Sequence, residues 1–476
     1  MEILQAFERW VRDAGTREAL VSRGENLCLD FAGLSERADR WSRLLDRRLG
    51  NRGDGLAVAV ATGNGVAFVE LVLALWRRGT AVMAMDGALS EGEKLGLCQR
   101  LGVPRLLHRG ESGSELADGV RHLDLRGPEL EPATVPEGVR LIKLTSGSTG
   151  DPVGLLFDLE SLAVGIRQIG EGMGLESSDR VLMALPLSHS YGFDNGVLSL
   201  FALGTPLILE PAKFPGPLLR ALAESRATFL PLVPPLVRSL GRVPWPEDLA
   251  LRTVICAGGR LDPEVAMAFR RASGRPVQDF YGSTETGGIS FETEPESPAA
   301  CGTVGRPLPG VRIDLDDDGR VVVTSRANRL GELGHPPRTD RRVVAGDLAQ
   351  WTPEGRLRLV GRSADFLDIG GRKVPAATIE RALLALPGVG DAAVVGVADA
   401  VRGERVVAFL VSDRWPVSTS GLDRSLAPRE MRRLEALPYS ERGKLDRTEL
   451  RRRALEGTGR GSGEASEGAR AVAKSR

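Results

Sequence analysis

Hydroxyl side chains and glycines crowd one short segment that follows the mostly apolar residues 141–144. Its members are Thr145, Ser146, Gly147, Ser148, Thr149 and Gly150. Because glycine permits unusual backbone angles and close approach, such a loop can turn its N–H and hydroxyl groups toward phosphate oxygens. A flexible Gly/Ser linker is the alternative, and the apolar runs on both sides argue against it. The segment is not a Walker loop, since no Gly-Lys-Ser/Thr follows at the required spacing.

A second polar segment, residues 279–288, follows an expected strand at residues 276–280. Tyr281 offers an aromatic face for a base, Thr284 a hydroxyl for a phosphate, and Glu285 a carboxylate for a hard cation such as Mg²⁺. Strand ends are where open α/β sheets bind ligands. Taken alone, this segment is equally compatible with an ordinary polar turn.

Short apolar runs of strand length alternate with longer stretches of helical spacing through the first two thirds of the chain. The helical spacing is clear at residues 65–78 and 262–273. The expected strands are residues 56–61, 181–185, 206–209, 228–230, 254–257 and 276–280. This alternation predicts an α/β fold, with mostly parallel sheets covered by helices.

Hairpins replace this alternation after about residue 300, where turn residues at 316–319 and 353–355 separate short apolar runs. The flanking expected strands are residues 311–315, 320–324, 348–351 and 357–360. A helix at residues 376–386 and strands at 392–397 and 405–412 suffice for a small α+β domain. The expected organisation is an N-terminal domain over 1–361, hairpin-rich at about 300–361, a C-terminal domain over 362–452 and a disordered tail over 453–476.

Composition and charge describe a folded protein of more than one domain. The chain has 476 residues, of which 42% are hydrophobic and 26% charged, and 63 basic residues balance 63 acidic ones. A net charge of zero gives no reason to expect a nucleic-acid partner. The four cysteines form no CxxC or Cys/His pattern, so neither a disulfide framework nor a zinc site is expected. Without a signal-peptide core or about 18 consecutive apolar residues, we expect a cytoplasmic protein with no transmembrane segment.

Together, the two polar segments resemble the phosphate loop and the adenylate-binding motif of the adenylate-forming (AMP-binding) superfamily, which includes acyl-CoA synthetases and aryl-CoA ligases. Further motifs of that superfamily are matched in order up to about residue 452. They are LPLSHSYG at 185–192 for the acid pocket, LVPP at 232–235 for its facing wall, CAGG at 256–259 beside the adenine, GD at 346–347 for the ribose, GRSAD at 361–365 for the hinge and YSERGKLD at 439–446 for the C-terminal lysine. This ordered set is far more specific than any single match.

The resemblance implies a reaction in two steps and a set of residues that perform it. A carboxylic acid would attack the α-phosphate of ATP and release pyrophosphate, and the acyl-AMP would then pass its acyl group to a phosphopantetheine thiol. The implied catalytic residues are Lys444, Thr284, Glu285 and His189, with Glu285 as the metal ligand. The implied nucleotide-binding residues are Thr145, Ser146, Gly147, Ser148, Thr149, Gly150, Gly258, Gly259, Tyr281, Gly282, Asp347 and Arg362. The implied acid-pocket residues are His189, Tyr191, Gly192, Val233, Pro234, Gly258 and Gly287.

The implied cofactors are ATP, Mg²⁺ and the phosphopantetheine of CoA or of a carrier protein. Lys444 would bridge the acid's carboxylate and the phosphate, and Asp347 would accept from the ribose hydroxyls. The C-terminal domain would be mobile, turning about Asp365 to expose a thiol channel at Gly371.

The residues do not identify the acid substrate. Counted back from Gly204, Tyr191 takes the place where amino-acid-activating relatives have an aspartate, and Asp194 lies one turn further along. A fatty or aryl acid without an α-amine is therefore expected. The aromatic content of 5% gives no sign of a stack dedicated to a ring substrate.

Some positions depart from the family pattern. Val153 stands where the phosphate loop usually has a lysine, and Ala364 and Asp368 replace a common acid and a common lysine near the hinge. These changes make a carrier protein an alternative to CoA as thiol acceptor. Two other hypotheses remain, a non-catalytic nucleotide-binding paralogue and an adenylate former with a non-thiol acceptor. The retained carboxylates and C-terminal lysine speak against the paralogue.

Overall fold

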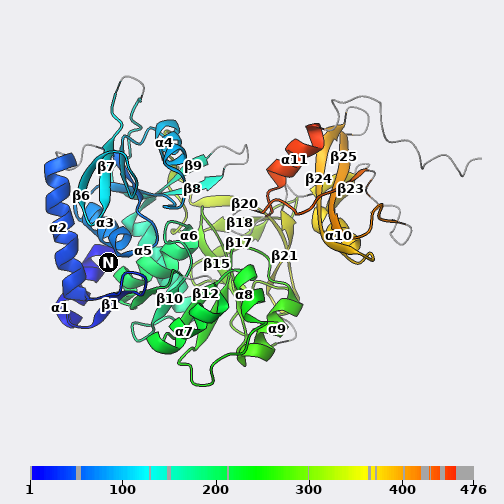
Figure 1. Cartoon of the computed structure of the whole chain (residues 1–476), viewed down its shortest axis with the longest axis horizontal. Helices are drawn as coiled ribbons and strands as arrows, with labels where there is room; N and C mark the ends of the chain where they lie inside the picture. The colour runs from blue at the N-terminus through cyan, green and yellow to red at the C-terminus, as the bar shows by residue number, and fades with distance from the viewer. Residues whose placement is uncertain are drawn as a thin grey trace, which may run out of the picture. The chain divides into compact units, whose positions relative to one another are not determined.

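A computed structural model describes residues 3–49, 55–127, 130–146, 152–211, 214–297, 300–362, 366–369, 372–399, 403–419, 428, 430–439 and 445–456. The chain divides into two compact units, Met1–Leu359 and Val360–Arg476, whose elements are traced in Figure 1. Among the described residues, no helix combines the length and apolar character needed to cross a membrane.

The first of two large sheets in the N-terminal unit has nine strands in the order β16-β15-β14-β13-β12-β10-β11-β1-β2. The strands from β14 to β1 are parallel, and the edge strands are antiparallel. The strands are β1 (Glu18–Ser22), β2 (Leu27–Asp30), β10 (Val181–Met183), β11 (Leu207–Leu209), β12 (Phe229–Leu232), β13 (Thr253–Cys256), β14 (Gln278–Ser283), β15 (Gly287–Phe291) and β16 (Arg306–Pro307).

The second large sheet has eight strands in the order β19-β9-β8-β4-β3-β5-β7-β6, and a smaller sheet follows the order β17-β18-β20-β21. The eight are β3 (Ala57–Ala61), β4 (Ala81–Ala84), β5 (Arg105–His108), β6 (Ser114–Ala117), β7 (Val120–Asp124), β8 (Val139–Ser146), β9 (Pro152–Asp158) and β19 (Gly331–Glu332). The smaller sheet has β17 (Arg312–Leu315), β18 (Arg320–Thr324), β20 (Arg342–Trp351) and β21 (Leu357–Arg362).

Helices cover both large sheets and enclose an apolar core between them. They are α1 (Ile3–Ala14), α2 (Phe31–Leu49), α3 (Val66–Arg77), α4 (Glu91–Arg100), α5 (Leu159–Met173), α6 (Ser190–Gly192), the π-helix η1 (Phe193–Leu203), α7 (Pro215–Ser225), α8 (Pro234–Leu240) and α9 (Pro263–Ser273). α3 is apolar on nearly all sides and almost wholly buried, as expected of a helix between layers. Trp76 of α3 contacts Phe193 and Phe201 of η1 at centroid distances of 6.0 Å.

The second unit packs helices on both faces of a three-stranded sheet, β24-β25-β26. Alternate residues of β24 face two separate apolar clusters, one built with α10 and the other with α11, as the period of two in a strand requires. Its elements are β22 (Phe366–Ile369), β23 (Arg372–Pro375), α10 (Ala376–Leu384), β24 (Val389–Asp399), β25 (Gly403–Ser412), β26 (Glu430–Arg433) and α11 (Arg447–Glu456).

The predicted α/β class is confirmed, and each apolar run expected in the first two thirds of the chain coincides with a strand to within about three residues at its ends. The expected hairpin at 311–324 is the antiparallel pair β17–β18, and the strands of the second expected hairpin, β20 and β21, are neighbours in the same sheet. The strand predicted at 348–351 is much longer, because β20 begins at Arg342 with alternating exposed and buried residues rather than an apolar run. The short strands β6 and β7, which carry several charged residues, gave no comparable signal.

Candidate active site

Two side chains predicted to bind the nucleotide are in direct contact in the N-terminal unit. Tyr281 of β14 donates a hydrogen bond of 2.9 Å to Asp347 Oδ2 of β20. The tyrosine is 7% exposed and the aspartate is partly exposed. An ionised carboxylate only accepts hydrogen bonds, so Asp347 has the chemistry to accept from ribose hydroxyls beside a buried aromatic ring.

The turn between β14 and β15 presents Thr284 and Glu285. The Glu285 carbonyl accepts a bond of 2.8 Å from the Arg329 N–H. A Cβ added at Gly282 would lie 2.6 Å from the Gly287 carbonyl oxygen, so only glycine lets the two sides approach this closely. The backbone of the turn is therefore fixed, while the Thr284 and Glu285 side chains stay partly exposed.

The predicted acid-pocket residue Tyr191 lies against the ends of β13 and β14. Its ring centroid is 5.9 Å from that of Phe280, and its hydroxyl donates to the Ile255 carbonyl at 3.4 Å. Burial, and then the neighbouring Cys256, raise the pKa of Tyr191 well above its usual value. Tyr191 is therefore a neutral phenol at physiological pH.

The facing wall of the expected acid pocket is also assembled. A Cβ added at Gly258 would lie 3.5 Å from Val233 Cγ1, and one at Gly259 would lie 3.5 Å from Pro234 Cγ. The end of β13 therefore contacts the start of α8. Gly192 packs on the Pro186 carbonyl, where an added Cβ would clash at 2.2 Å.

His189 lies immediately before α6, with its Nε2 atom 3.4 Å from Asp86 Oδ2. That atom is buried and makes no aligned hydrogen bond among the described residues. No role was predicted for Asp86, although this residue directly follows Met85 at the end of the buried strand β4. The structure thus adds a carboxylate beside the histidine predicted to flank the reacting acid.

The loop that carries His189 is held by Asn64, which follows β3 and was also missed. Asn64 Nδ2 donates to the Leu185 carbonyl at 3.1 Å, and its Oδ1 accepts from the Leu187 N–H at 2.9 Å. A single side chain thus satisfies two backbone groups of the acid-pocket motif. Its position just beyond a strand end was the only available signal.

Asp194 forms a buried ion pair with Lys143. Lys143 Nζ lies 2.7 and 2.9 Å from the two carboxylate oxygens of Asp194 and 3.0 Å from Ser190 Oγ, and the two side chains are 4% and 8% exposed. A Cβ added at Gly287, a predicted acid-pocket residue, would lie 3.8 Å from Asp194 Oδ2. Asp194 is therefore beside the expected pocket with its charge already neutralised. A lone lysine within the apolar run 141–144 was the signal for this pair.

The predicted phosphate segment emerges from the β8–β9 hairpin. Thr145 pairs with Val153 across the hairpin and is partly exposed. Other predicted positions lie outside the described residues, namely Gly147, Ser148, Thr149, Gly150, Asp365, Gly371 and Lys444. The side chains of Ser146 and Arg362 are likewise outside them.

No cluster of three or more His, Cys, Asp or Glu side chains that could hold a metal is present in the described part of the chain. Glu285, the predicted metal ligand, supplies one partly exposed carboxylate. Mg²⁺ is commonly bound by one or two carboxylates together with substrate phosphates and water, so this donor set fits a cation that arrives with the nucleotide.

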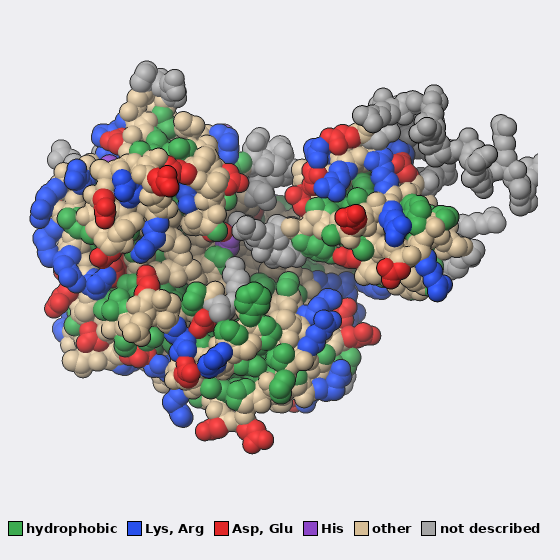
Figure 2. Space-filling view, in the orientation of Figure 1, with side chains coloured by type: hydrophobic (Ala, Val, Ile, Leu, Met, Phe, Trp, Pro, Cys, Tyr) green, Lys and Arg blue, Asp and Glu red, His purple; other side chains and the backbone are tan. Residues whose placement is uncertain are grey.

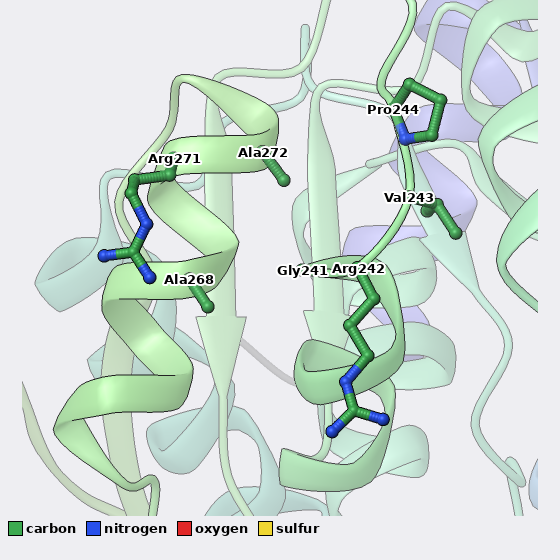
Figure 3. Close-up of a pocket in the computed structure, with 7 residues that line it drawn as sticks. All are labelled: Gly241, Arg242, Val243, Pro244, Ala268, Arg271 and Ala272. Carbon is green, nitrogen blue, oxygen red and sulfur yellow. The ribbon is translucent and has the colours of Figure 1, made fainter.

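A surface hollow of about 390 Å³ lies elsewhere, between α8 and α9. Arg242 and Arg271 flank it, with Ala268 and Ala272 between them (Figure 3). Apolar side chains gather over α8, and basic ones beside α9, on the face shown in Figure 2. The hollow contains none of the predicted site residues, so we do not identify it with the acid pocket.

Comparison with known families gives two matches. Residues 7–334 match the family model described as AMP-binding enzyme, and residues 378–444 match that of the AMP-binding enzyme C-terminal domain.

Individual relatives extend over most of the chain. A salicylyl-CoA synthase / salicylate adenylyltransferase of Streptomyces sp. is 29% identical, covering 94% of this chain and 92% of the relative. A 3-[(3aS,4S,7aS)-7a-methyl-1,5-dioxo-octahydro-1H-inden-4-yl]propanoyl:CoA ligase of Mycobacterium tuberculosis is 28% identical, covering 79% and 80%. The o-succinylbenzoate CoA synthetase of Bacillus subtilis, solved with its acyl-adenylate intermediate, has a TM-score of 0.79 at 22% identity and covers 94% and 98%. At this identity the solved structure supports the fold.

Proposed function

Because the chain belongs to the AMP-binding enzyme family, we propose that it activates a carboxylic acid with ATP and passes the acyl group to a thiol. The enzyme is an AMP-forming acid:thiol ligase. In the first step a carboxylate oxygen bonds to the α-phosphorus of ATP and pyrophosphate leaves. In the second, the thiol sulfur bonds to the carbonyl carbon and AMP leaves. The family match over both units is the observation that carries this proposal.

For the nucleotide, Tyr281 would stack on adenine while Asp347 accepts from the ribose hydroxyls. Their mutual hydrogen bond supports this assignment, because it holds both groups at one place before the nucleotide arrives. Gly258 and Gly259 would bring backbone close to the base, and the segment starting at Thr145 would cradle the phosphates. Preorganised groups of this kind stabilise the transition state without reorganising during the reaction.

For the acid, His189 would flank the reacting carboxylate and Lys444 would bridge it to the α-phosphate. Asp86, 3.4 Å from the histidine ring, would orient that ring. Bringing two anionic groups together is the main difficulty of the first step, so positioning and charge compensation should supply most of the catalysis.

Glu285 would hold Mg²⁺, and the cation would supply charge compensation for the phosphates of the nucleotide. The partly exposed carboxylate on the fixed β14–β15 turn is the feature that supports this assignment. Because Val153 replaces the lysine usual in the phosphate loop, the cation has more charge to compensate in this chain.

The substrate is proposed to be an acid without an α-amine. Asp194, the carboxylate beside the expected pocket, already forms an ion pair with Lys143. Its charge is therefore compensated, and it is not available to pair with a substrate ammonium. The acids in the names of the two relatives at 28–29% identity both carry rings. An aryl or other ring-bearing acid is therefore favoured over a linear fatty acid.

The acceptor is proposed to be the phosphopantetheine thiol of CoA, with a carrier protein as the alternative. The second unit would turn about Asp365 between the two steps, removing Lys444 and opening a channel at Gly371. Rigid-body rotation about a few backbone angles is a common way to couple two half reactions.

Pyrophosphate release tests the proposal. The protein is supplied with ATP, Mg²⁺ and a panel of ring-bearing, fatty and amino acids, with CoA, with a phosphopantetheine-loaded carrier protein, or with neither. We expect acid-dependent pyrophosphate release and thioester formation with CoA. Asp347→Ala serves as a control and should depress release with every acid.

Each alternative predicts a different result. ATP binding without pyrophosphate release for any acid would identify a non-catalytic paralogue. Pyrophosphate release with no thioester on either thiol would indicate a different acceptor. Thioester formation on the carrier protein but not on CoA would identify the carrier protein as the acceptor.

A further inference from the structure

The surface hollow between α8 and α9 is firmly framed, although the proposed reaction does not use it. Its volume is about 390 Å³, and its lining includes Ala268 and Ala272 of α9. A Cβ added at Gly241 would lie 2.9 Å from the Phe269 backbone nitrogen, so only glycine lets the end of α8 approach α9 this closely. The Trp245 ring packs on Phe269 at a centroid distance of 5.1 Å. The hollow is therefore a fixed feature of this surface.

Two arginines flank the hollow. Arg242 follows the end of α8, and Arg271 lies in the last turn of α9 (Figure 3). Both residues are exposed, and neither guanidinium makes a hydrogen bond or an ion pair within the described part of the chain. The adjacent Arg270, by contrast, pairs with Glu296 at 2.8 Å. The hollow therefore presents two positive charges that have no partner among the described residues.

The exposed side of α8 connects the hollow with the expected acid pocket. Val233, a residue of the expected pocket wall, directly precedes α8. Pro235 and Arg238 are exposed three residues apart on one face of this helix, and Arg242 follows four residues later. The seven residues of α8 span about 10 Å. A partner bound at the hollow is therefore about one short helix away from the pocket wall.

The surroundings of the hollow suit a protein partner better than an enclosed small molecule. Small-molecule sites bury most of their ligand, whereas Arg242, Pro244 and Arg271 of the lining are exposed. Met267 of α9 is 52% exposed, and apolar side chains gather over α8 (Figure 2). Protein interfaces combine such apolar surface with arginine. By charge complementarity, the partner should present acidic side chains beside apolar ones.

We propose that this surface docks the acidic helix of a carrier protein, which thereby serves as a second acceptor beside CoA. The inference rests on the proposed transfer to a thiol. Arg242 and Arg271 would pair with carboxylates of the carrier helix, and Arg238 with the phosphodiester of the phosphopantetheine arm. The extended arm is longer than α8, so its thiol reaches the pocket wall. The chemistry is unchanged, since the sulfur replaces AMP on the carbonyl carbon and the thiol proton is released.

The test compares a carrier protein with CoA as the acceptor. The enzyme receives ATP, Mg²⁺, an acid that it activates, and either CoA or a phosphopantetheine-loaded acyl carrier protein with an acidic recognition helix, and kcat/KM for thioester formation is measured. Arg242→Glu/Arg271→Glu should lower kcat/KM for the carrier by roughly tenfold, because like charges then meet, and should leave the value for CoA unchanged. Added salt should lower the carrier value of the wild type and raise that of the variant.

Two matched changes separate docking from a general effect of charge. Arg40→Glu/Arg43→Glu makes the same reversal at exposed positions of α2 and should leave both acceptors unaffected. A carrier with lysines in place of the acidic residues of its recognition helix should restore transfer by Arg242→Glu/Arg271→Glu. Because CoA is the reference acceptor in every assay, a loss of folded enzyme would lower both values and would not imitate the expected result.

Failure of this inference can be separated from failure of the proposed function. Basic side chains near helix C-termini also stabilise the helix, and that simpler role predicts a lower melting temperature with an unchanged ratio between acceptors. This result, or a wild type that acylates CoA but not the carrier, would overturn the docking site while thiol transfer stands. If neither acceptor is acylated, calorimetric titration with the same carrier tests the surface directly. A wild type that binds the carrier no more tightly than Arg242→Glu/Arg271→Glu does would then reject the inference as well.

Discussion

The Tyr281 hydroxyl and the Asp347 carboxylate are 2.9 Å apart, although 66 positions separate them in the chain. Tyr281 belongs to the nine-stranded sheet and Asp347 to the four-stranded sheet. Two residues matched to different family motifs therefore form one group before any nucleotide binds. This contact is the strongest geometric support for the proposed adenosine site.

The adenine assignment predicts nucleotide selectivity. ATP with Mg²⁺ should raise the melting temperature, because binding adds about 2.7 kcal/mol of stability at a hundredfold excess over Kd. GTP should do so much less, since Tyr281 and the backbone at Gly258 and Gly259 are proposed to receive adenine. Equal shifts with both nucleotides in a thermal melt would mean that the base lies elsewhere.

Asp347→Ala should weaken nucleotide affinity more than Tyr281→Phe. The first change removes the proposed acceptor for the ribose hydroxyls, whereas the second keeps the aromatic face and loses one hydrogen bond, worth about 1 kcal/mol. Calorimetric titration with a non-hydrolysable acyl-AMP analogue measures both. If Asp347→Ala binds the analogue as tightly as the wild type, the ribose site has been misplaced.

Lys143→Met should strongly destabilise the N-terminal unit. It leaves the Asp194 carboxylate buried without its partner, which typically costs about 3–5 kcal/mol. The double variant Lys143→Met/Asp194→Leu should recover much of the loss, as urea denaturation can show. Lys94→Met is the matched control, because this buried lysine donates to the carbonyl oxygen of Gly87, which is a neutral acceptor. A loss in Lys94→Met equal to that in Lys143→Met would contradict the special cost of the unpaired charge.

Lys444→Ala should separate the two half reactions. Losing one preorganised charge partner should slow pyrophosphate release by roughly two to three orders of magnitude. Transfer from synthetic acyl-AMP to the thiol should stay near the wild-type rate, whereas Gly371→Leu should show the reverse pattern. Equal impairment of both steps by Lys444→Ala would reject a mechanism with two positions of the C-terminal unit.

Stability should fall as the pH rises toward neutrality because of Asp279. Burial, and then the Glu292 carboxylate, raise the pKa of Asp279 from 3.8 to about 7. Between these values the folded protein holds a proton that the unfolded chain has released, so the free energy of unfolding decreases with pH, by an amount on the order of a few kcal/mol. Asp279→Asn should remove this decrease in urea titrations at pH 4 to 8. The exposed Asp317→Asn is the control and should keep the wild-type slope.

The sequence predicted the strands and motifs well where the signal was local. The apolar runs at β3, β10 and β13 can be recognised from consecutive residues alone, and so can the motif around Tyr281. The contact of Tyr281 with Asp347 could be expected only through the family resemblance, since no local rule joins residues so far apart.

The residues that the sequence missed act through tertiary partners. In the sequence, Lys143 is a single charged residue in an otherwise apolar strand, because its ion-pair partner Asp194 lies 51 positions away in the chain. Asp86 and Asn64 follow β4 and β3, but their targets lie more than a hundred residues away in the His189 loop. The extended π-helix likewise depends on the packing around η1, and nothing in its composition separates it from an α-helix.

The Lys143–Asp194 pair has a consequence for engineering the enzyme. β8 carries both Lys143 and the start of the segment proposed to cradle phosphate, while Asp194 lies in the first turn of η1, beside the expected acid pocket. Grafting the η1 segment of another acid ligase into this scaffold would leave Lys143 facing a foreign side chain, at the cost of a buried unpaired ammonium. A transplant of substrate preference should therefore include position 143 as a co-substitution, even though that position precedes the grafted helix by about fifty residues.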